Sequence, residues 1–143
     1  MMEFDGVDTS GTNGSGAIVQ VATSTFGNPA ASQSTSTVTL QAASDSNNRP
    51  VAGFATQVNE AITPQVNWEE IHDTGHATPN ARIETQWRSD AFEATASSSW
   101  ATSTAGAAVA IEIKAADVGG APVTRSLSGR GLTRDSSGNP LRR

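Results

Sequence analysis

The residue types best suited to chemistry are concentrated in one short segment, residues 69–76, which contains both histidines of the chain. Two glutamates, an aspartate and the histidines His72 and His76 are donors of the kind that zinc sites use. The four-residue spacing of the histidines suits one face of a helix. Gly75 and the neighbouring pattern disfavour a helix here, so we predict polar residues at the end of a strand and no metal site.

The triplet Asp73-Thr74-Gly75 matches that of aspartic proteases, in which two aspartates share one proton. A homodimer would supply the second aspartate. In those enzymes the triplet follows a strongly apolar strand, whereas here it follows Glu-Glu-Ile-His. The chain contains no Gly-x-Ser-x-Gly sequence, and its glycine-rich residues 5–16 lack the lysine and the following helix of a phosphate loop. We therefore predict no catalytic residues, no cofactor and no enzymatic activity.

Residues 81–88 show most clearly which secondary structure would position any site. Mainly apolar and strongly polar side chains alternate along this segment. Ile83, Thr85 and Trp87 occupy odd positions, and charged or amide side chains occupy the even positions. Successive side chains of a strand point to opposite faces, so this segment is predicted to be a strand whose odd face is dry. The predicted core between two stacked sheets is Phe54, Ile83, Trp87, Trp100 and Ile111.

Alternating segments recur along the chain, separated by turns about every 8–12 residues, which is typical of sandwiches and barrels. They are residues 17–23, 35–42, 51–58, 66–72, 81–88, 92–100 and 107–114. The predicted fold is all-β and antiparallel, a β-sandwich of about seven or eight strands. We expect an extended N-terminal arm at residues 1–16, the sandwich domain at residues 17–116 and a basic C-terminal tail at residues 117–143.

The charge of the chain is divided unevenly along its length. Residues 1–124 carry 4 basic and 13 acidic side chains, whereas residues 125–143 carry five arginines and one aspartate. We expect the tail to contact an acidic partner or a neighbouring copy, or to fray as a solvated terminus. The acidic body argues against nucleic acid as a partner. The predicted partner-binding residues are Arg125, Arg130, Arg134, Arg142 and Arg143.

Cysteine is absent, which excludes disulfides and thiolate metal sites. The acidic start of the chain lacks the pattern of a signal peptide. No apolar run approaches the roughly 20 residues that span a membrane. We expect a soluble protein that is made in a cytoplasm and has no membrane partner.

The three tryptophans are predicted to lie in the core, because a chain with so few large apolar side chains needs them there. Trp68 has an alternative interpretation, since it follows a polar loop. Exposed, it would form a ligand surface for a sugar or a protein together with its polar neighbours. The residues of that alternative surface are Asn67, Trp68, Glu69 and His72.

The order of segments also carries a resemblance. An early strand precedes the Thr- and Ser-rich residues 36–40, the apolar residues 51–55 and a loop that leads to Trp68. An aromatic strand, a Phe- and Ser-rich strand and a closing strand follow, at residues 81–88, 92–100 and 108–113. Over residues 17–116 this order resembles the small jelly-roll-like β-sandwich domains of tailed-bacteriophage virion proteins. Asn67 stands where that pattern usually has glycine, and the usual tyrosines are missing.

The resemblance implies a structural role in a virion assembled in the bacterial host. The first hypothesis is a capsid decoration protein on the head surface, whose terminal arms bind the major capsid protein or other virion subunits in many copies or as a homo-oligomer. The alternative hypothesis is a carbohydrate-binding or host-adhesion domain associated with the tail or a fibre. Polar arms at both ends suit the first hypothesis, because such arms become ordered when they drape over neighbours.

Overall fold

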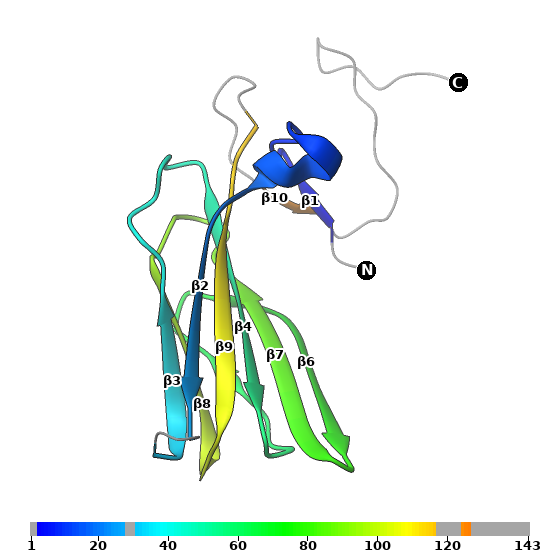
Figure 1. The fold of residues 1–143 in the computed structure, drawn as a ribbon, viewed down its shortest axis with the longest axis vertical. Helices are drawn as coiled ribbons and strands as arrows, with labels where there is room; N and C mark the ends of the chain where they lie inside the picture. Colours follow the sequence, from blue (N-terminus) through cyan, green and yellow to red (C-terminus); the bar gives the residue numbers. More distant parts are fainter. Residues whose placement is uncertain (1–2, 28–30, 117–123, 127–143) are drawn as a thin grey trace, which may run out of the picture.

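A computed structural model describes residues 3–27, 31–116 and 124–126, and shows two antiparallel sheets facing one another in an elongated sandwich (Figure 1). The five-stranded sheet has the order β2–β9–β4–β7–β6, and the three-stranded sheet has the order β3–β8–β5. The predicted all-β, antiparallel sandwich is confirmed. The strands of the larger sheet are β2 (Ile18–Phe26), β4 (Arg49–Thr56), β6 (Glu69–Ala77), β7 (Asn80–Trp87) and β9 (Gly106–Ile113). The strands of the smaller sheet are β3 (Gln33–Thr39), β5 (Thr63–Pro64) and β8 (Thr95–Thr104).

The main core fills the space between the two sheets. Phe54 of β4 is completely buried, and the rings of Phe26 and Trp100 stack with their centroids 5.2 Å apart. The smaller sheet contributes Val38 of β3 and Ala96 of β8 to the same cluster. Phe54 and Trp100 therefore lie in the interior, as the sequence predicted.

The prediction that the odd-numbered side chains of β7 face the space between the sheets is wrong. Ile83 is 48% exposed on the outside of the sandwich, whereas Glu84 and Gln86 are fully buried. In the ladder with β4, Phe54 pairs with Glu84 and Ala52 pairs with Gln86. Paired residues of neighbouring strands share a face, so the polar row of β7 lies on the same face as Phe54.

The same reversal applies to β9. Ala108 and Ala110 belong to the main core, while Ile111 and Val109 alternate with them and lie on the outer face. Alternation shows that a strand has two different faces, but the partner strands decide which face is inside. Ile111 was therefore wrongly assigned to the space between the sheets.

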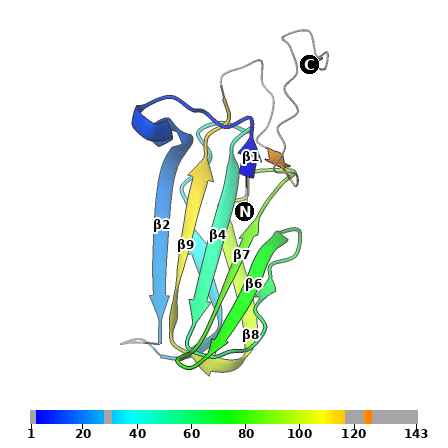
Figure 2. The same ribbon diagram turned by 90° about the vertical axis from the view of Figure 1, so that its right-hand side faces the viewer.

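Trp87 is buried, but in a second cluster on the outer face. Phe4 lies against it with ring centroids 5.5 Å apart, and Ile113 and Ala115 complete the contact. Phe4 belongs to β1 (Glu3–Asp5), which pairs with β10 (Thr124–Ser126) near the end of the larger sheet (Figure 2). The short helix η1 (Thr12–Ala17) then leads into β2. No helix in these described parts is long and apolar enough to cross a membrane.

The segment expected as an extended N-terminal arm lies against the sandwich in residues 3–17. Val7 forms an isolated bridge with Ala115, and Lys114 Nζ donates a hydrogen bond to Asp8 Oδ2 at 2.7 Å. This contact with Lys114, with a further hydrogen bond from Ser10, lowers the pKa of Asp8 to about 2. The physical reason for the docking is that Phe4 and Val7 cover apolar side chains that the larger sheet turns outward.

The segment between residues 72 and 81, which the sequence pattern predicts to be a loop, is mostly strand. Strand β6 continues through Ala77, and Asn80 begins β7 directly opposite, so the two strands form a hairpin. The side chains of His72, Thr74 and His76 are exposed on this strand, which lies at the edge of the larger sheet.

Replacing Phe4 by alanine should lower the free energy of unfolding by about 2 kcal/mol, less than the cost at a fully buried phenylalanine. Because Phe4 covers Trp87, the tryptophan emission of the folded variant should also shift to longer wavelength. Urea unfolding followed by fluorescence measures both effects. Glu3→Ala, at an exposed position of the same strand, is the control. Unchanged emission in Phe4→Ala would show that the segment does not cover the indole.

Candidate functional site

The outer face of the five-stranded sheet carries large apolar side chains that nothing in the described chain covers. Val21 is 60% exposed, Ile83 48% and Val109 42%. They come from three different strands, β2, β7 and β9, and each alternates with residues that face the interior. We call this surface the open face. It comprises Val21, Gly53, Ala55, Ile83, Ala107 and Val109.

The open face has a groove along its central strand. On β4, Gly53 and Ala55 present almost no side chain, whereas the paired positions on the flanking strands carry Val109 and Thr85. The result is a depression of about 520 Å³ with almost entirely apolar walls. Among the residues that the structure describes, none that lines it is charged, and its polar lining residues are Ser24 and the threonines Thr23, Thr25 and Thr85.

The second cluster bounds the open face at one end. Val51 and Ile111 line the groove and also belong to the cluster that Phe4 and Val7 cover. The N-terminal segment thus covers one part of a continuous apolar surface and leaves the rest exposed. The part of this surface that stays uncovered is an exposed apolar patch of the kind that marks interaction sites.

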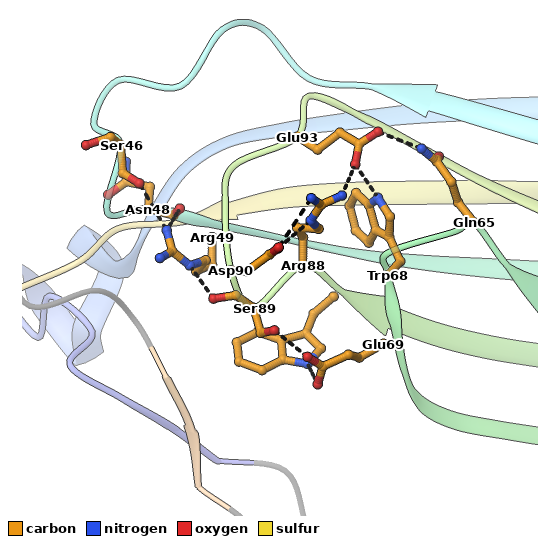
Figure 3. Close-up of polar contacts among 11 residues, drawn as sticks. Ser46, Asn48, Arg49, Gln65, Trp68, Glu69, Arg88, Ser89, Asp90 and Glu93 are labelled. Atoms are coloured by element: carbon orange, nitrogen blue, oxygen red, sulfur yellow. Dashed lines mark hydrogen bonds and ion pairs between the residues drawn. The ribbon is translucent and has the colours of Figure 1, made fainter.

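A polar network links the loops at one end of the sandwich (Figure 3). Glu93 accepts hydrogen bonds from Trp68 Nε1 at 3.1 Å and Gln65 Nε2 at 2.6 Å, and its Oε2 lies 2.7 Å from Arg88 Nη1. Arg88 also contacts Asp90, with Nε 2.5 Å from Oδ1. Both oxygens of the Glu93 carboxylate are therefore occupied, and the network fixes loops rather than presenting a free acid or base.

The alternative ligand surface does not form around Trp68. Its indole is only 6% exposed and its N–H is held by Glu93, so it has no face available to stack on a sugar. Asn67, with φ of 69°, Glu69 and His72 are exposed around it. Glu69 is engaged as well, since it accepts hydrogen bonds from Trp87 Nε1 at 3.2 Å and from Ser89 Oγ.

The structure does not group residues 69–76 into either of the sites considered for them, a zinc site or an aspartic-protease dyad. Asp73 forms a two-bond ion pair with Arg82, with Oδ1–Nε 2.6 Å and Oδ2–Nη2 2.8 Å. This pairing raises the pKa of Arg82 and occupies the carboxylate that a protease dyad needs free. His76 lies at the hairpin turn, with Nδ1 3.3 Å from the carbonyl oxygen of Pro79. Within the part of the chain that the structure describes, no three His, Asp or Glu side chains are grouped to hold a metal ion.

The arginines predicted as partner contacts lie almost entirely beyond the described residues. The backbone of Arg125 is part of β10 and pairs with Phe4 of β1. The remaining four, Arg130, Arg134, Arg142 and Arg143, fall outside the described residues.

Sequence reasoning missed two carboxylates inside the sandwich, Glu84 and Glu112, both fully buried. Burial raises the pKa of Glu84 to about 8. A hydrogen bond that Ser98 Oγ donates to Glu84 Oε2 at 3.3 Å lowers this pKa, but by less than burial raises it. Glu84 Oε1 has no hydrogen-bond partner among the described residues. The one sequence signal for this site is Ser98, which falls on the inner face of β8 between the core residues Ala96 and Trp100.

Glu112 has the opposite environment. Burial opposes its charge, but donors from Asn48, Gln20 and Ser44 outweigh burial and hold the pKa of Glu112 below its ordinary value. Asn48 Nδ2 lies 2.5 Å from Oε1, which also accepts from the backbone N and the Oγ of Ser44, each at 3.1 Å. Gln20 Nε2 donates to Oε2. The carboxylate is thus a charged anchor that ties β2, β9 and the loop before β4 together.

Comparisons with known proteins give no relative for this chain: no family model, no curated protein and no solved structure matches it.

Proposed function

We propose that this chain is a structural protein that works by docking onto other protein surfaces in a large assembly, and that the assembly is the head of a tailed bacteriophage, where the chain acts as a capsid decoration protein. The observation that carries the assembly role is the open face. A contiguous apolar surface of this kind, formed by Val21, Ile83 and Val109 and hollowed at Gly53, is typical of a protein–protein interface.

The chemistry of the open face favours a protein surface over a small substrate. Binding sites for small polar ligands combine apolar walls with a few converging polar groups. The groove along β4 has apolar walls, but no charged side chain from the described part of the chain lines it. A surface that offers shape and apolar area without converging polar groups is suited to packing against another surface.

The placement on a phage head rests on the resemblance of residues 17–116 and on the charge of the tail. In this proposal the acidic sandwich stands on the shell, and the arginine-rich residues 125–143 contact the major capsid protein or adjacent subunits. Such contacts are charge-assisted and weaken as salt rises.

Binding to purified phage heads tests this function. Replacing Arg130, Arg134, Arg142 and Arg143 together by glutamine should lower occupancy at least tenfold at moderate salt, while β10, which contains Arg125, is left intact. Co-sedimentation with heads, followed by quantification of copies per particle, gives the measurement. The circular-dichroism spectrum of the variant should remain that of the parent, since the described sandwich does not include these residues.

Two outcomes would count against the proposal. Undiminished binding of the four-arginine variant would remove the role of the tail. A handful of copies per particle, in place of hundreds, would move the protein from the head surface to the tail.

A further inference from the structure

We propose that the open face is the interface of a symmetric homodimer, in which two copies pack their five-stranded sheets against each other. This inference rests on the proposed assembly role in that both treat the open face as an interface. It names the occupant of that face as a second copy of the chain.

The charge distribution makes a second copy an acceptable partner. The chain carries a net charge of −5, so two copies repel one another over most of their surfaces. Of the described residues, none that lines the groove along β4 is charged. The acidic side chains on β7 and β9, Glu84 and Glu112, point into the sandwich and are fully buried. Two open faces can therefore meet without bringing carboxylates together, and each removes apolar area from water.

The strand registers make the face complementary to itself. In the sheet order β2–β9–β4–β7–β6, a two-fold axis that runs along the strands between β9 and β4 places β9 of one copy over β4 of the other, and β2 over β7. Val109 is paired with Gly53 at the same height on these strands. The axis therefore seats the Val109 side chain of each copy over the Gly53 groove of the other.

The positions toward Gly106 fit the same operation. Ala107 is paired with Ala55, so two small residues meet beside the central contact. On the outer strands, Thr25 of β2 comes to lie over Ile83 of β7, because both stand at the height of Ala107. In the other direction Val21 would lie over Trp87, which Phe4 already covers, so the contact is confined to the uncovered half of the strands. Aligned sheets cross at about 30°, so the contacts close to the axis, Val109 over Gly53 above all, decide the affinity.

The area buried between the two open faces indicates how tightly the dimer binds. Four strands about 4.8 Å apart, each presenting about 20 Å of length, give a footprint of about 400 Å² per copy in projection. Two such footprints total about 800 Å², which is below the range of stable specific interfaces and typical of a weak, transient contact. We therefore expect a reversible dimer in the micromolar range, which neighbouring copies on a particle would reinforce through their high local concentration.

An exchange of two side chains tests this geometry. A Cβ at Gly53 would meet its nearest neighbours at 3.6 Å, an ordinary contact, and Gly53 lines the open groove into which a larger side chain would extend. Gly53→Val should fill the groove that receives Val109 and weaken dimerisation at least tenfold. The double variant Gly53→Val/Val109→Gly, which moves the same side chain across to the paired strand, should restore much of the dimer.

Sedimentation equilibrium of the purified full chain from about 1 µM to 1 mM provides the measurement, with the weight-average mass rising from the monomer value of 14.7 kDa toward twice that value. Val109→Asp should keep the chain monomeric. Thr37→Asp is the matched control, since Thr37 is exposed on β3 of the other sheet and should leave the dimer intact.

A wild-type chain that stays monomeric throughout this range overturns the proposal, and so does a dimer that survives both Val109→Asp and Gly53→Val. Monomeric chain whose Val109→Asp variant nevertheless loses binding to phage heads would assign the open face to the shell instead of a second copy. Since dimerisation is measured without particles, its failure and the failure of head binding are separate results.

Discussion

Glu84→Gln should raise the free energy of unfolding at pH 9 by roughly 4 kcal/mol relative to the parent protein. The folded-state pKa of Glu84 is about 8 against an ordinary value of 4.5, because burial disfavours the charged form. Each pH unit between these values is worth about 1.4 kcal/mol for a group that is protonated only in the folded state. The amide of glutamine has the same shape and never ionises.

The sign of the pH dependence follows from the raised pKa. Below about pH 4.5, Glu84 is neutral in both the folded and the unfolded protein, and its stabilising contribution is fully present. As the pH rises toward about 8, the unfolded chain ionises freely while the folded chain must hold the proton, so stability is lost. Urea unfolding at pH 5 and pH 9 should show the variant close to the parent at pH 5 and clearly more stable at pH 9. Equal stability of the two proteins at pH 9 would mean that Glu84 is solvated.

Glu112→Ala should lower the free energy of unfolding by about 3 kcal/mol or more at neutral pH, because it leaves several buried donors without an acceptor. Glu112 is fully buried and receives hydrogen bonds from Asn48, Gln20 and Ser44. Asn48 is itself 1% exposed and also accepts a hydrogen bond from the backbone N of Ala115. Loss of the carboxylate should therefore loosen both the loop before β4 and the end of β9.

The two buried carboxylates form a matched pair for this measurement. Glu84→Gln and Glu112→Gln make the same chemical change, yet the first should stabilise the protein at alkaline pH and the second should destabilise it. Glu112 is held ionised by its donors, so glutamine loses charge and places an amide N–H₂ against donors. Chemical denaturation of both variants at pH 9 gives the comparison, and a stabilised Glu112→Gln would contradict the assignment of Glu112 as an anchored anion.

The fold could be predicted because alternation with a period of two is a property of single strands. Residues 81–88 and 107–114 were recognised as strands, and the structure has β7 and β9 within one residue of those bounds. The burial of Trp68 and Trp100 was also predicted, from the scarcity of large apolar side chains, and is confirmed. These conclusions depend on local spacing and overall composition, which a sequence carries directly.

The orientation of the strands could not be obtained in this way. The pattern of β7 separates Ile83 from Glu84, and hydrophobicity alone places the isoleucine inside. The structure reverses this because Glu84 pairs with Phe54 and meets Ser98 on a strand that lies 14 residues further along the chain. The sequence does not reveal the open face for the same reason, since its pattern places Ile83 and Ile111 in the core.

The anchor around Glu112 depends on contacts that no local pattern encodes. Gln20 is 92 residues away in the chain and Asn48 is 64 residues away. Such donors converge only after β2, β4 and β9 have paired, so tertiary structure creates the site that lowers the pKa of Glu112.

The apolar side of β7 faces solvent while the small residues of β9 face the core, and thiol labelling tests this orientation most directly. The chain has no cysteine, so Ile83→Cys and Ala108→Cys each introduce a unique thiol. At submicromolar concentration and in the Val109→Asp background, where copies do not associate, Ile83→Cys should react with a thiol reagent nearly as fast as the unfolded chain. Ala108→Cys, at a position only 4% exposed, should be protected by several orders of magnitude. A protected Ile83→Cys beside a reactive Ala108→Cys would contradict the account.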